Sequence, residues 1–350
     1  MALSREEAAD LARQCVPLMR ERSNLSIPTD LECSLTEKDV QVQNKCRLWA
    51  GMGFIYTISF HNYIIVVKRI MPPPKERQSF GDRRKAVSYE VEAAFYENVA
   101  LDLVNGGLSI PVPFLVQRDG GQITICMSYL EGRGGPYNDS ETYAVLSWLA
   151  QLHAATWGEK ADQLVCGLQP IGSYWHLDTR PDEHDSMARR GWEGRLKLAA
   201  KAIDERLKRD NMQCCIHGDA KDANMLFSGK GERCTVSMYD FQYYGKAPPA
   251  VDLAYFLCVG VGSTDEDGEL LKYYHKELLN RLAPGSPRPS LVELKDSLAL
   301  AFCDFQRFMS GWGNWGCDLS DIVRQTLDRL DGGKQLTEDG YRDAVTRVFG

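Results

Sequence analysis

The chain has 350 residues, of which 44% are hydrophobic and 25% are charged, and its formal net charge is −7. This composition supports a sizeable folded core and is untypical of a disordered protein. The negative charge disfavours nucleic acid and anionic membranes as main partners, because both select for clustered Lys and Arg. No apolar run approaches the roughly 20 residues of a membrane helix, and the N-terminus lacks the pattern of a secretory signal. We therefore expect a cytoplasmic protein without membrane insertion.

The eleven cysteines are scattered, odd in number and without any C-x-x-C pair. This spacing predicts reduced thiols rather than a zinc site or a disulfide framework.

The first third of the chain is predicted to be rich in strands. An amphipathic helix at residues 6–20 comes first, followed by a polar, irregular stretch. Residues 54–60 then alternate as a half-buried strand does, and the β-branched run 63–68 forms a second strand after a short turn. Together they predict a hairpin, which Pro72-Pro73-Pro74 ends because proline removes a ladder donor. A long helix is expected at residues 86–104.

Two further strands are predicted at residues 112–116 and 122–129, before the glycine-rich segment 131–136. After that segment the chain is predicted to be mostly helical. The expected helices lie at residues 141–157, 192–209, 290–309 and 319–329, interrupted by a brief strand pair at 225–227 and 235–239. We therefore predict an α+β protein with a small N-terminal sheet lobe, one long helix and a larger helical lobe.

Three regions follow from this order. Residues 1–44 are interpreted as a helical extension, residues 45–130 as a nucleotide-binding lobe, and residues 131–350 as a lobe with a catalytic loop and an acceptor site. Two lobes of this kind can supply a cleft that closes over a nucleotide and excludes water.

The strongest chemical signal is the segment His217 to Asn224, followed by Tyr239-Asp240-Phe241-Gln242. Phosphoryl transfer needs a carboxylate that orients and deprotonates a hydroxyl, and hard oxygen ligands for magnesium. The pattern supplies Asp219 as the expected base, with Asn224 and Asp240 as the expected magnesium ligands.

These motifs resemble those of the aminoglycoside phosphotransferase and choline kinase superfamily, which has a protein-kinase-like bilobal fold. D-F-Q followed by Pro248 to Leu257 is most similar to the ecdysteroid-kinase-like group. The resemblance implies an ATP- and Mg²⁺-dependent kinase that phosphorylates a hydroxyl of a small metabolite. It also implies that Asp252 anchors the catalytic loop, although an aspartate there also suits a helix N-cap. His217 is expected to shape the loop by hydrogen bonds, and His153 to be structural.

Lys221 departs from this group, which often has an aromatic residue or histidine at that position. Serine/threonine protein kinases show D-x-K-x-x-N, and Lys221 is expected to reach the γ-phosphate in the same way. A protein kinase is therefore one alternative. Against it, no D-F-G or A-P-E is present, and only about ten residues separate Asp240 from Asp252, too few for a regulated activation loop. A pseudokinase scaffold that binds nucleotide is the other alternative.

A kinase also needs a cation on the α- and β-phosphates of ATP. Lys68 closes an apolar strand, where a charge is costly without a partner. Glu92 lies in a segment similar to the E-x-x-F-Y of the family, so we predict a Lys68–Glu92 pair. Glu90 is a competing partner, and Lys85 and Arg69 are weaker alternatives for the cation.

The nucleotide contacts are otherwise expected from the backbone. Gly51 and Gly53 precede the strand 54–60, where a phosphate-covering turn would lie. Glycines at such a position often serve only to form the turn. Ser128, Tyr129 and Leu130 follow the last strand of the first lobe and are expected to bind adenine.

The acceptor, an alcohol, is expected against the helical lobe. The aromatic-rich segment 302–316 offers Asp304, Arg307, Trp312 and Trp315 for a small-molecule pocket, with core packing as the alternative. The charged loop 180–190 is a candidate lid. A sterol, a choline-like amine, an aminoglycoside or another alcohol all remain open as the acceptor, as does the oligomeric state.

Overall fold

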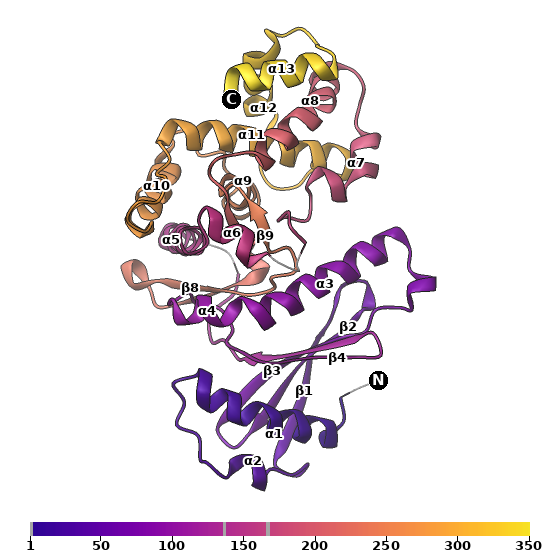
Figure 1. The fold of residues 1–350 in the computed structure, drawn as a ribbon, viewed down its shortest axis with the longest axis vertical. Helices are drawn as coiled ribbons and strands as arrows, with labels where there is room; N and C mark the ends of the chain where they lie inside the picture. The colour runs from indigo at the N-terminus through magenta and orange to yellow at the C-terminus, as the bar shows by residue number, and fades with distance from the viewer. Residues whose placement is uncertain (1–2, 136–137, 166–168) are drawn as a thin grey trace. The chain divides into compact units, whose positions relative to one another are not determined.

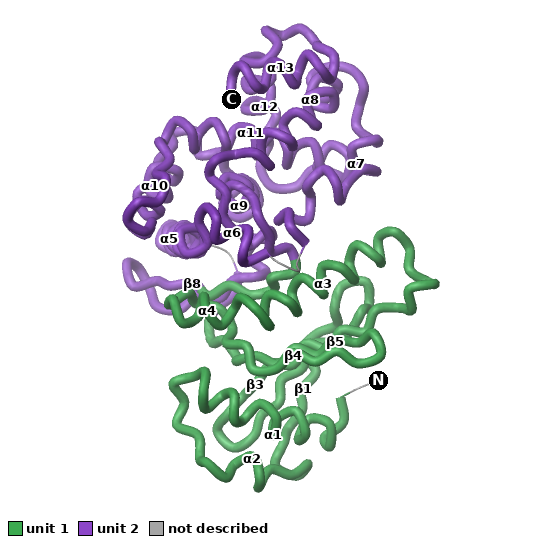
Figure 2. Tube along the Cα trace, in the orientation of Figure 1, with its two compact units in different colours: residues 1–132, 237–242 green, residues 133–236, 243–350 purple. Residues whose placement is uncertain are grey.

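The computed structural model describes residues 3–135, 138–165 and 169–350. The chain forms two compact units (Figure 2). Unit 1 comprises residues 1–132 together with 237–242, and unit 2 comprises residues 133–236 together with 243–350. A sheet-containing first unit and a mainly helical second unit confirm the predicted α+β fold class.

Unit 1 is built on a five-stranded antiparallel sheet in the order β1-β2-β3-β5-β4 (Figure 1). The strands are β1 (Val40–Arg47), β2 (Gly53–Phe60), β3 (Tyr63–Ile70), β4 (Pro113–Asp119) and β5 (Gln122–Ser128). The predicted hairpin is confirmed, because β2 and β3 pair from Gly53↔Ile70 to Phe60↔Tyr63. The proline run begins two residues after β3 ends.

Strand β1 was not predicted. Only Val40 of its eight residues is buried, and most of the others are polar and exposed. The strand lies at the edge of the sheet and pairs with β2 alone. An edge strand of this composition carries little of the apolar alternation by which strands are recognised.

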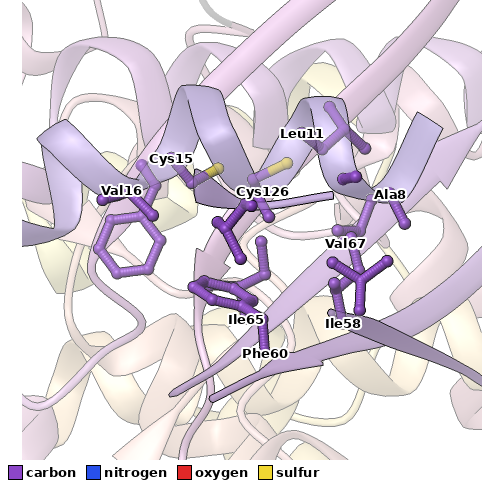
Figure 3. Packing of buried hydrophobic residues seen from close by; sticks show 14 of the residues in the cluster. Ala8, Leu11, Cys15, Val16, Ile58, Phe60, Ile65, Val67 and Cys126 are labelled. Carbon is purple, nitrogen blue, oxygen red and sulfur yellow. The ribbon is translucent and has the colours of Figure 1, made fainter. Parts of the chain in front are cut away.

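One face of the sheet packs against helix α1 (Arg5–Arg22), and the short helix α2 (Leu31–Ser34) follows it. Figure 3 shows Ala8, Leu11, Cys15 and Val16 of α1 above apolar side chains of the sheet. These sheet residues are fully or almost fully buried, and they include Ile58, Phe60, Ile65, Val67 and Cys126. Alternate residues of a strand point to opposite faces, so the position after Val67, Lys68, faces away from α1.

The other face of the sheet meets helix α3 (Phe80–Asn98), which continues after Val99 as α4 (Ala100–Asn105). The helix predicted at 86–104 thus begins earlier and is interrupted. A capping box starts it: the Ser79 hydroxyl accepts from the Asp82 amide, and Asp82 accepts from the Ser79 amide. This short polar signal precedes the apolar part of the helix, which explains the late predicted start.

Unit 2 is mainly helical, with two small two-stranded sheets. Its helices are α5 (Asp139–Ala155), α6 (Glu159–Leu164), α7 (Pro181–Ser186), α8 (Gly191–Lys208), α9 (Ala250–Tyr255), α10 (Glu269–Arg281), α11 (Leu291–Trp312), α12 (Ser320–Asp331) and α13 (Glu338–Phe349). Strand β6 (Cys214–Ile216) pairs with β9 (Gly245–Ala247), and β7 (Met225–Ser228) pairs with β8 (Thr235–Met238), which runs on into unit 1. Among the described residues, every helix is too short or too polar to cross a bilayer.

The core of unit 2 forms around α11, whose residues from Leu300 to Met309 are all buried. Helices α8, α9, α7 and α12 pack against it, and α5 packs against α10. Helices α5, α8, α11 and α12 lie close to their predicted positions, whereas α10 and α13 were not predicted.

Candidate active site

Lys68 is buried in unit 1 between two carboxylates. Its Nζ lies 2.6 Å from Glu92 Oε2 and 2.9 Å from Asp240 Oδ1. Only 5% of the lysine side chain and 1% of the Glu92 side chain are exposed, whereas 29% of the Asp240 side chain is exposed. The structure therefore forms the predicted Lys68–Glu92 ion pair and adds the aspartate of D-F-Q as a second partner.

The electrostatics of this trio make the lysine a permanent cation. Burial opposes the charge of Lys68, but the carboxylates of Asp240 and Glu92 raise its pKa above the ordinary value. Burial alone would also raise the pKa of Asp240, yet the nearby Lys68 and Lys85 charges lower it to about 2. Burial raises the pKa of Glu92 to about 7 against the opposing effect of Lys68. Asp240 is thus the carboxylate most firmly ionised at neutral pH.

The competing candidates for the cation and its partner are engaged elsewhere. Glu90 lies 3.1 Å from Arg118 Nε on the exposed side of α3. Arg69 pairs with Glu7 of α1 at 3.0 Å, on the opposite face of the sheet. Lys85 donates to Gln242 Oε1 at 2.5 Å, so it contributes to the position of D-F-Q without replacing Lys68.

The D-F-Q segment contacts α3 through Phe241 and Gln242. Phe241 is fully buried and stacks on Phe95 with 4.0 Å between the ring centroids. Gln242 accepts from Ser88 at 3.1 Å and donates to the Asp240 carboxylate. Asp240 itself has a φ of +70°, a left-handed conformation that is uncommon outside glycine and concentrates at functional sites.

The predicted catalytic loop lies in unit 2 and is held through its backbone. The fully buried Asp252 of α9 accepts from the His217 amide at 2.7 Å and from the Gly218 amide at 2.9 Å. His153 of α5 contacts the same carboxylate at 3.3 Å and the Tyr274 hydroxyl at 2.8 Å. This geometry is the one implied for Asp252 by the resemblance, and it gives His153 a structural contact rather than a place at the loop surface.

Glycine is required at position 218. Its φ is +79°, and a Cβ there would lie 2.1 Å from the Tyr243 carbonyl oxygen. The neighbouring His217 is fully buried, and its Nδ1 lies 3.3 Å from the Asp219 amide. The histidine therefore contacts the backbone of the loop, in keeping with the expected shaping role.

Asp219 is buried, with its carboxylate among polar partners from the same loop. Lys221 Nζ lies 2.9 Å from Asp219 Oδ2, and Asn224 Nδ2 donates to that oxygen at 3.1 Å and to the Asp219 carbonyl at 2.9 Å. The lysine side chain remains 34% exposed, so its ammonium has room to move. Asp219 and Asn224, predicted from the spacing of the motif, and Lys221, predicted from its likeness to protein kinases, thus meet around one carboxylate.

Two tyrosines near Asp219 were missed by the sequence analysis. The Tyr174 hydroxyl lies 3.3 Å from the Tyr255 hydroxyl and donates to it. Burial and the nearby Asp219 charge raise the pKa of Tyr255. Tyr255 was visible in the sequence as the tyrosine three residues after Asp252, whereas Tyr174 had no local signal.

The glycines of the predicted phosphate turn have a structural reason of their own. Gly53 begins β2 with a φ of +141°, and a Cβ there would lie 2.0 Å from the Arg69 carbonyl oxygen. Gly51 ends a single 3₁₀ turn before it. Ser128 ends β5 and bonds the backbone of Val112, and the expected adenine-binding residues Tyr129 and Leu130 follow it.

The candidate acceptor residues separate into two sets. Arg307 is fully buried on α11, where it bonds Asp304 at 2.7 Å and the Trp175 carbonyl at 2.5 Å. This arrangement favours core packing, the alternative considered for the pair. Trp312 is 56% exposed, and Trp315 is half-buried with its ring 5.6 Å from that of Phe308.

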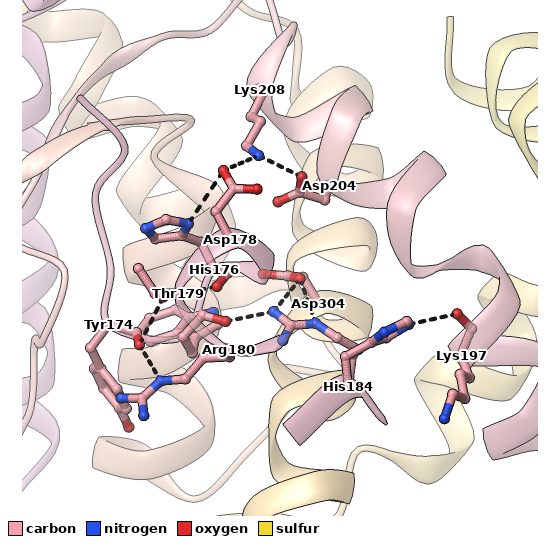
Figure 4. A network of polar contacts seen from close by, with 12 residues as sticks. Tyr174, His176, Asp178, Thr179, Arg180, His184, Lys197, Asp204, Lys208 and Asp304 are labelled. Carbon is pink, nitrogen blue, oxygen red and sulfur yellow. Dashed lines mark hydrogen bonds and ion pairs between the residues drawn. The ribbon is translucent and has the colours of Figure 1, made fainter. Parts of the chain in front are cut away.

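A polar network surrounds the start of the candidate lid (Figure 4). Lys208 of α8 pairs with Asp178 at 2.7 Å and with Asp204 at 2.6 Å. Burial raises the pKa of Asp204 to about 6, and burial lowers the pKa of the nearby His176 to about 4. Arg180 is also buried, and its Nε donates to the Tyr174 carbonyl at 2.7 Å.

The two residues expected to bind magnesium lie in different units, Asp240 in unit 1 and Asn224 in unit 2. No group of three or more His, Cys, Asp or Glu side chains within the described ranges is placed to hold a metal. Mg²⁺ bound with a nucleotide usually takes only one or two protein ligands, with phosphates and water as the rest. In unit 1, Asp240 is ionised and partly exposed. In unit 2, the side-chain nitrogen of Asn224 donates to Asp219.

One solved structure shares the fold of this chain, and two more distant ones also match it. A Ralstonia eutropha protein provisionally named as an aminoglycoside phosphotransferase matches over 96% of this chain and 98% of its own, with 12% identity and a TM-score of 0.51. An ethanolamine kinase from Plasmodium vivax matches over 94% and 93%, with 13% identity and a TM-score of 0.47. A choline kinase from Streptococcus pneumoniae matches over 89% and 94%, with 14% identity and a TM-score of 0.39. No curated protein matches the chain.

The assignment to a family rests on the sequence. The sequence model of the phosphotransferase enzyme family matches residues 76–289, which include α3, the catalytic loop, D-F-Q and α9. The narrower ecdysteroid-kinase-like assignment stays a prediction. The chain belongs to the phosphotransferase enzyme family, whose members are small-molecule kinases that phosphorylate hydroxyl groups.

Proposed function

We propose that this protein is an ATP- and Mg²⁺-dependent kinase that transfers the γ-phosphate to a hydroxyl of a small metabolite. The observation that carries the proposal is the Asp219 carboxylate, which lies between Lys221 and Asn224 on a loop that Asp252 anchors. A buried carboxylate with a mobile cation beside it suits a base in phosphoryl transfer.

Asp219 orients the acceptor hydroxyl and takes its proton as the oxygen attacks. Lys221 pairs with this carboxylate before substrates bind, and a third of its side chain is exposed. An ammonium that moves from the carboxylate to the phosphate serves both partners. It offsets the charge of the carboxylate at first, and it later offsets negative charge on the transferred group.

Unit 1 supplies the nucleotide contacts. Lys68 binds the α- and β-phosphates, and Glu92 keeps the lysine in place after a nucleotide has joined it. The backbone of residues 128–130 binds adenine. Magnesium would supply charge neutralisation on the phosphates, and Asp240 and Asn224 would each offer it an oxygen ligand. Asp240, the carboxylate of the trio with a lowered pKa and partial exposure, is the group of unit 1 best suited to a divalent cation.

A protein kinase fits the chain less well, although Lys221 is a protein-kinase trait. After D-F-Q the chain enters β9 at Gly245 and α9 at Ala250. This short path has no room for a regulated activation segment. Phosphorylation of generic protein substrates, without phosphorylation of metabolites, would favour a protein kinase over a small-molecule kinase.

ATP consumption across a library of alcohols tests the proposal. The Asp219→Asn variant should lose about 10²–10⁴-fold in kcat, the usual contribution of general acid–base catalysis. The control is Asp222→Asn, which changes an exposed aspartate of the same loop and should leave turnover unchanged. Turnover that survives Asp219→Asn, or that persists after magnesium removal, contradicts the proposal. A protein that binds nucleotide and phosphorylates no alcohol is the pseudokinase alternative.

A further inference from the structure

An aromatic cage surrounds the guanidinium of Arg180 in unit 2. Its Cζ lies 5.5 Å from the ring centre of Tyr174, 5.0 Å from that of Phe308 and 5.5 Å from that of Trp312. Three rings at these distances make the arrangement by which proteins bind organic cations. We call these three rings the aromatic cage.

The arginine is buried within the cage and held there by polar contacts. Its exposure is 7%, although Trp312 on the outer side is 56% exposed. Its Nε donates to the Tyr174 carbonyl, and its Nη1 lies 3.3 Å from Glu183 Oε1. The second carboxylate oxygen of Glu183 is buried and has no hydrogen-bond partner among the described residues. Arg180 is therefore the cation that offsets this buried carboxylate.

The cage adjoins the proposed base. Tyr174 is both a wall of the cage and the donor to Tyr255, and Tyr255 lies close enough to Asp219 for the carboxylate charge to raise the pKa of its hydroxyl. The rings of Tyr174 and Tyr255 lie 5.7 Å apart, and that of Phe308 lies 5.5 Å from that of Tyr174. A continuous set of aromatic side chains thus runs from Asp219 to the exposed Trp312.

We propose that Arg180 determines acceptor specificity by filling the aromatic cage beside Asp219, so that the enzyme phosphorylates uncharged or acidic alcohols and rejects alcohols with a cationic amine. The inference rests on the proposed kinase function. A cationic group that approaches the cage meets rings already occupied and an arginine of the same charge. An uncharged or acidic acceptor has no such repulsion, and the guanidinium attracts an acidic one.

A matched pair of probes separates charge from shape. Choline and 3,3-dimethylbutan-1-ol have nearly the same shape and differ in the positive charge. Binding to the full chain is followed by tryptophan fluorescence, since Trp312 is a wall of the cage, and it needs no turnover. The wild-type protein should show no preference for choline over the uncharged alcohol.

Removing the arginine should create a cation site. In Arg180→Ala the rings and the buried Glu183 remain, so choline should bind at least about tenfold more tightly than the uncharged alcohol, as expected for a desolvated cation over aromatic rings. If the unpaired Glu183 prevents folding, Arg180→Ala/Glu183→Gln keeps the rings without the buried charge and should still prefer choline. The control is Arg189→Gln, an exposed arginine of the same segment, which should behave as wild type.

Choline binding to the wild-type protein as tightly as to the variants overturns the proposal, and so does the absence of a choline preference in both folded variants. Turnover measurements distinguish a wrong proposal for Arg180 from a wrong proposal of kinase function. A choline preference confined to the Arg180 variants, with no alcohol phosphorylated by any form, supports the cage and refutes the kinase. Wild-type phosphorylation of choline within tenfold of the kcat/KM for its uncharged analogue supports the kinase and refutes the role of Arg180.

Discussion

Replacing Asp252 by asparagine removes one of the two oxygens that hold the backbone of the catalytic loop. The aspartate accepts from the amides of His217 and Gly218, and it is fully buried. Asparagine keeps one acceptor oxygen but turns a nitrogen donor toward the second amide. One buried N–H of the loop is then left without an acceptor, and two donors face each other.

The size of the effect follows from these contacts. A hydrogen bond to a charged group contributes about 1.5–3 kcal/mol, and a buried N–H without an acceptor costs about 1–3 kcal/mol. We therefore expect Asp252→Asn to lower the free energy of unfolding of unit 2 by about 3 kcal/mol. For a unit of about 150–250 residues this corresponds to a fall in Tm of about 6–12 °C.

Tryptophan fluorescence suits the assay, because all the tryptophans except Trp49 belong to unit 2. Thermal and urea unfolding of Asp252→Asn would be compared with those of Asp222→Asn, which also removes a carboxylate that accepts from a backbone amide, but on the exposed side of the loop. The control should change stability by less than about 0.5 kcal/mol. Equal losses of unfolding free energy in the two variants would refute the inference that Asp252 holds the backbone of the catalytic loop.

Two other predictions concern pH and packing. Because burial lowers the pKa of His176 to about 4 from about 6.5, its contribution to stability is complete above pH 6.5 and is lost as the pH falls toward 4, by about 3 kcal/mol in all. Urea unfolding at pH 7.5 and 4.5 should show this loss in wild type and not in His176→Gln; parallel losses would contradict it. Phe241→Ala should cost about 3–5 kcal/mol in unit 1, measured by hydrogen exchange of the β3 and α3 amides, because Phe241 is buried against Phe95. The exposed Phe80→Ala is its control, and equal protection in both variants would rule the stacking out.

The parts of the site that were predictable depend on local spacing or on charge. Asp219, Lys221 and Asn224 lie within six residues, so one turn of chain brings them together. The Lys68–Glu92 pair was predictable because a lysine in an apolar strand needs a carboxylate. That argument did not exclude Glu90. The structure separates the two because Glu90 lies on the exposed side of α3, where Arg118 binds it.

The parts that were missed depend on contacts between distant segments. Arg180 enters the aromatic cage because α7 packs against α11, more than 100 residues later, and no local pattern records this. Helix α13 was missed because only Tyr341, Ala344, Val345 and Phe349 of its residues are buried, and Gly340 lies in its first turn. Both failures arise where tertiary packing decides what the local pattern leaves ambiguous.

The segment 237–242 has a consequence for biosynthesis, since it belongs to unit 1 although unit 2 residues precede and follow it. A nascent chain that has emerged as far as Gly132 carries Lys68 and Phe95 without Asp240 and Phe241. The β-sheet of unit 1 can form at that stage, but its buried lysine has only Glu92 and its aromatic surface is uncovered. Unit 1 is complete only after about 100 more residues have left the ribosome, which at about 5–20 residues per second takes about 5–20 seconds. During this interval the exposed face of α3 is a site where chaperones would bind and where aggregation would begin.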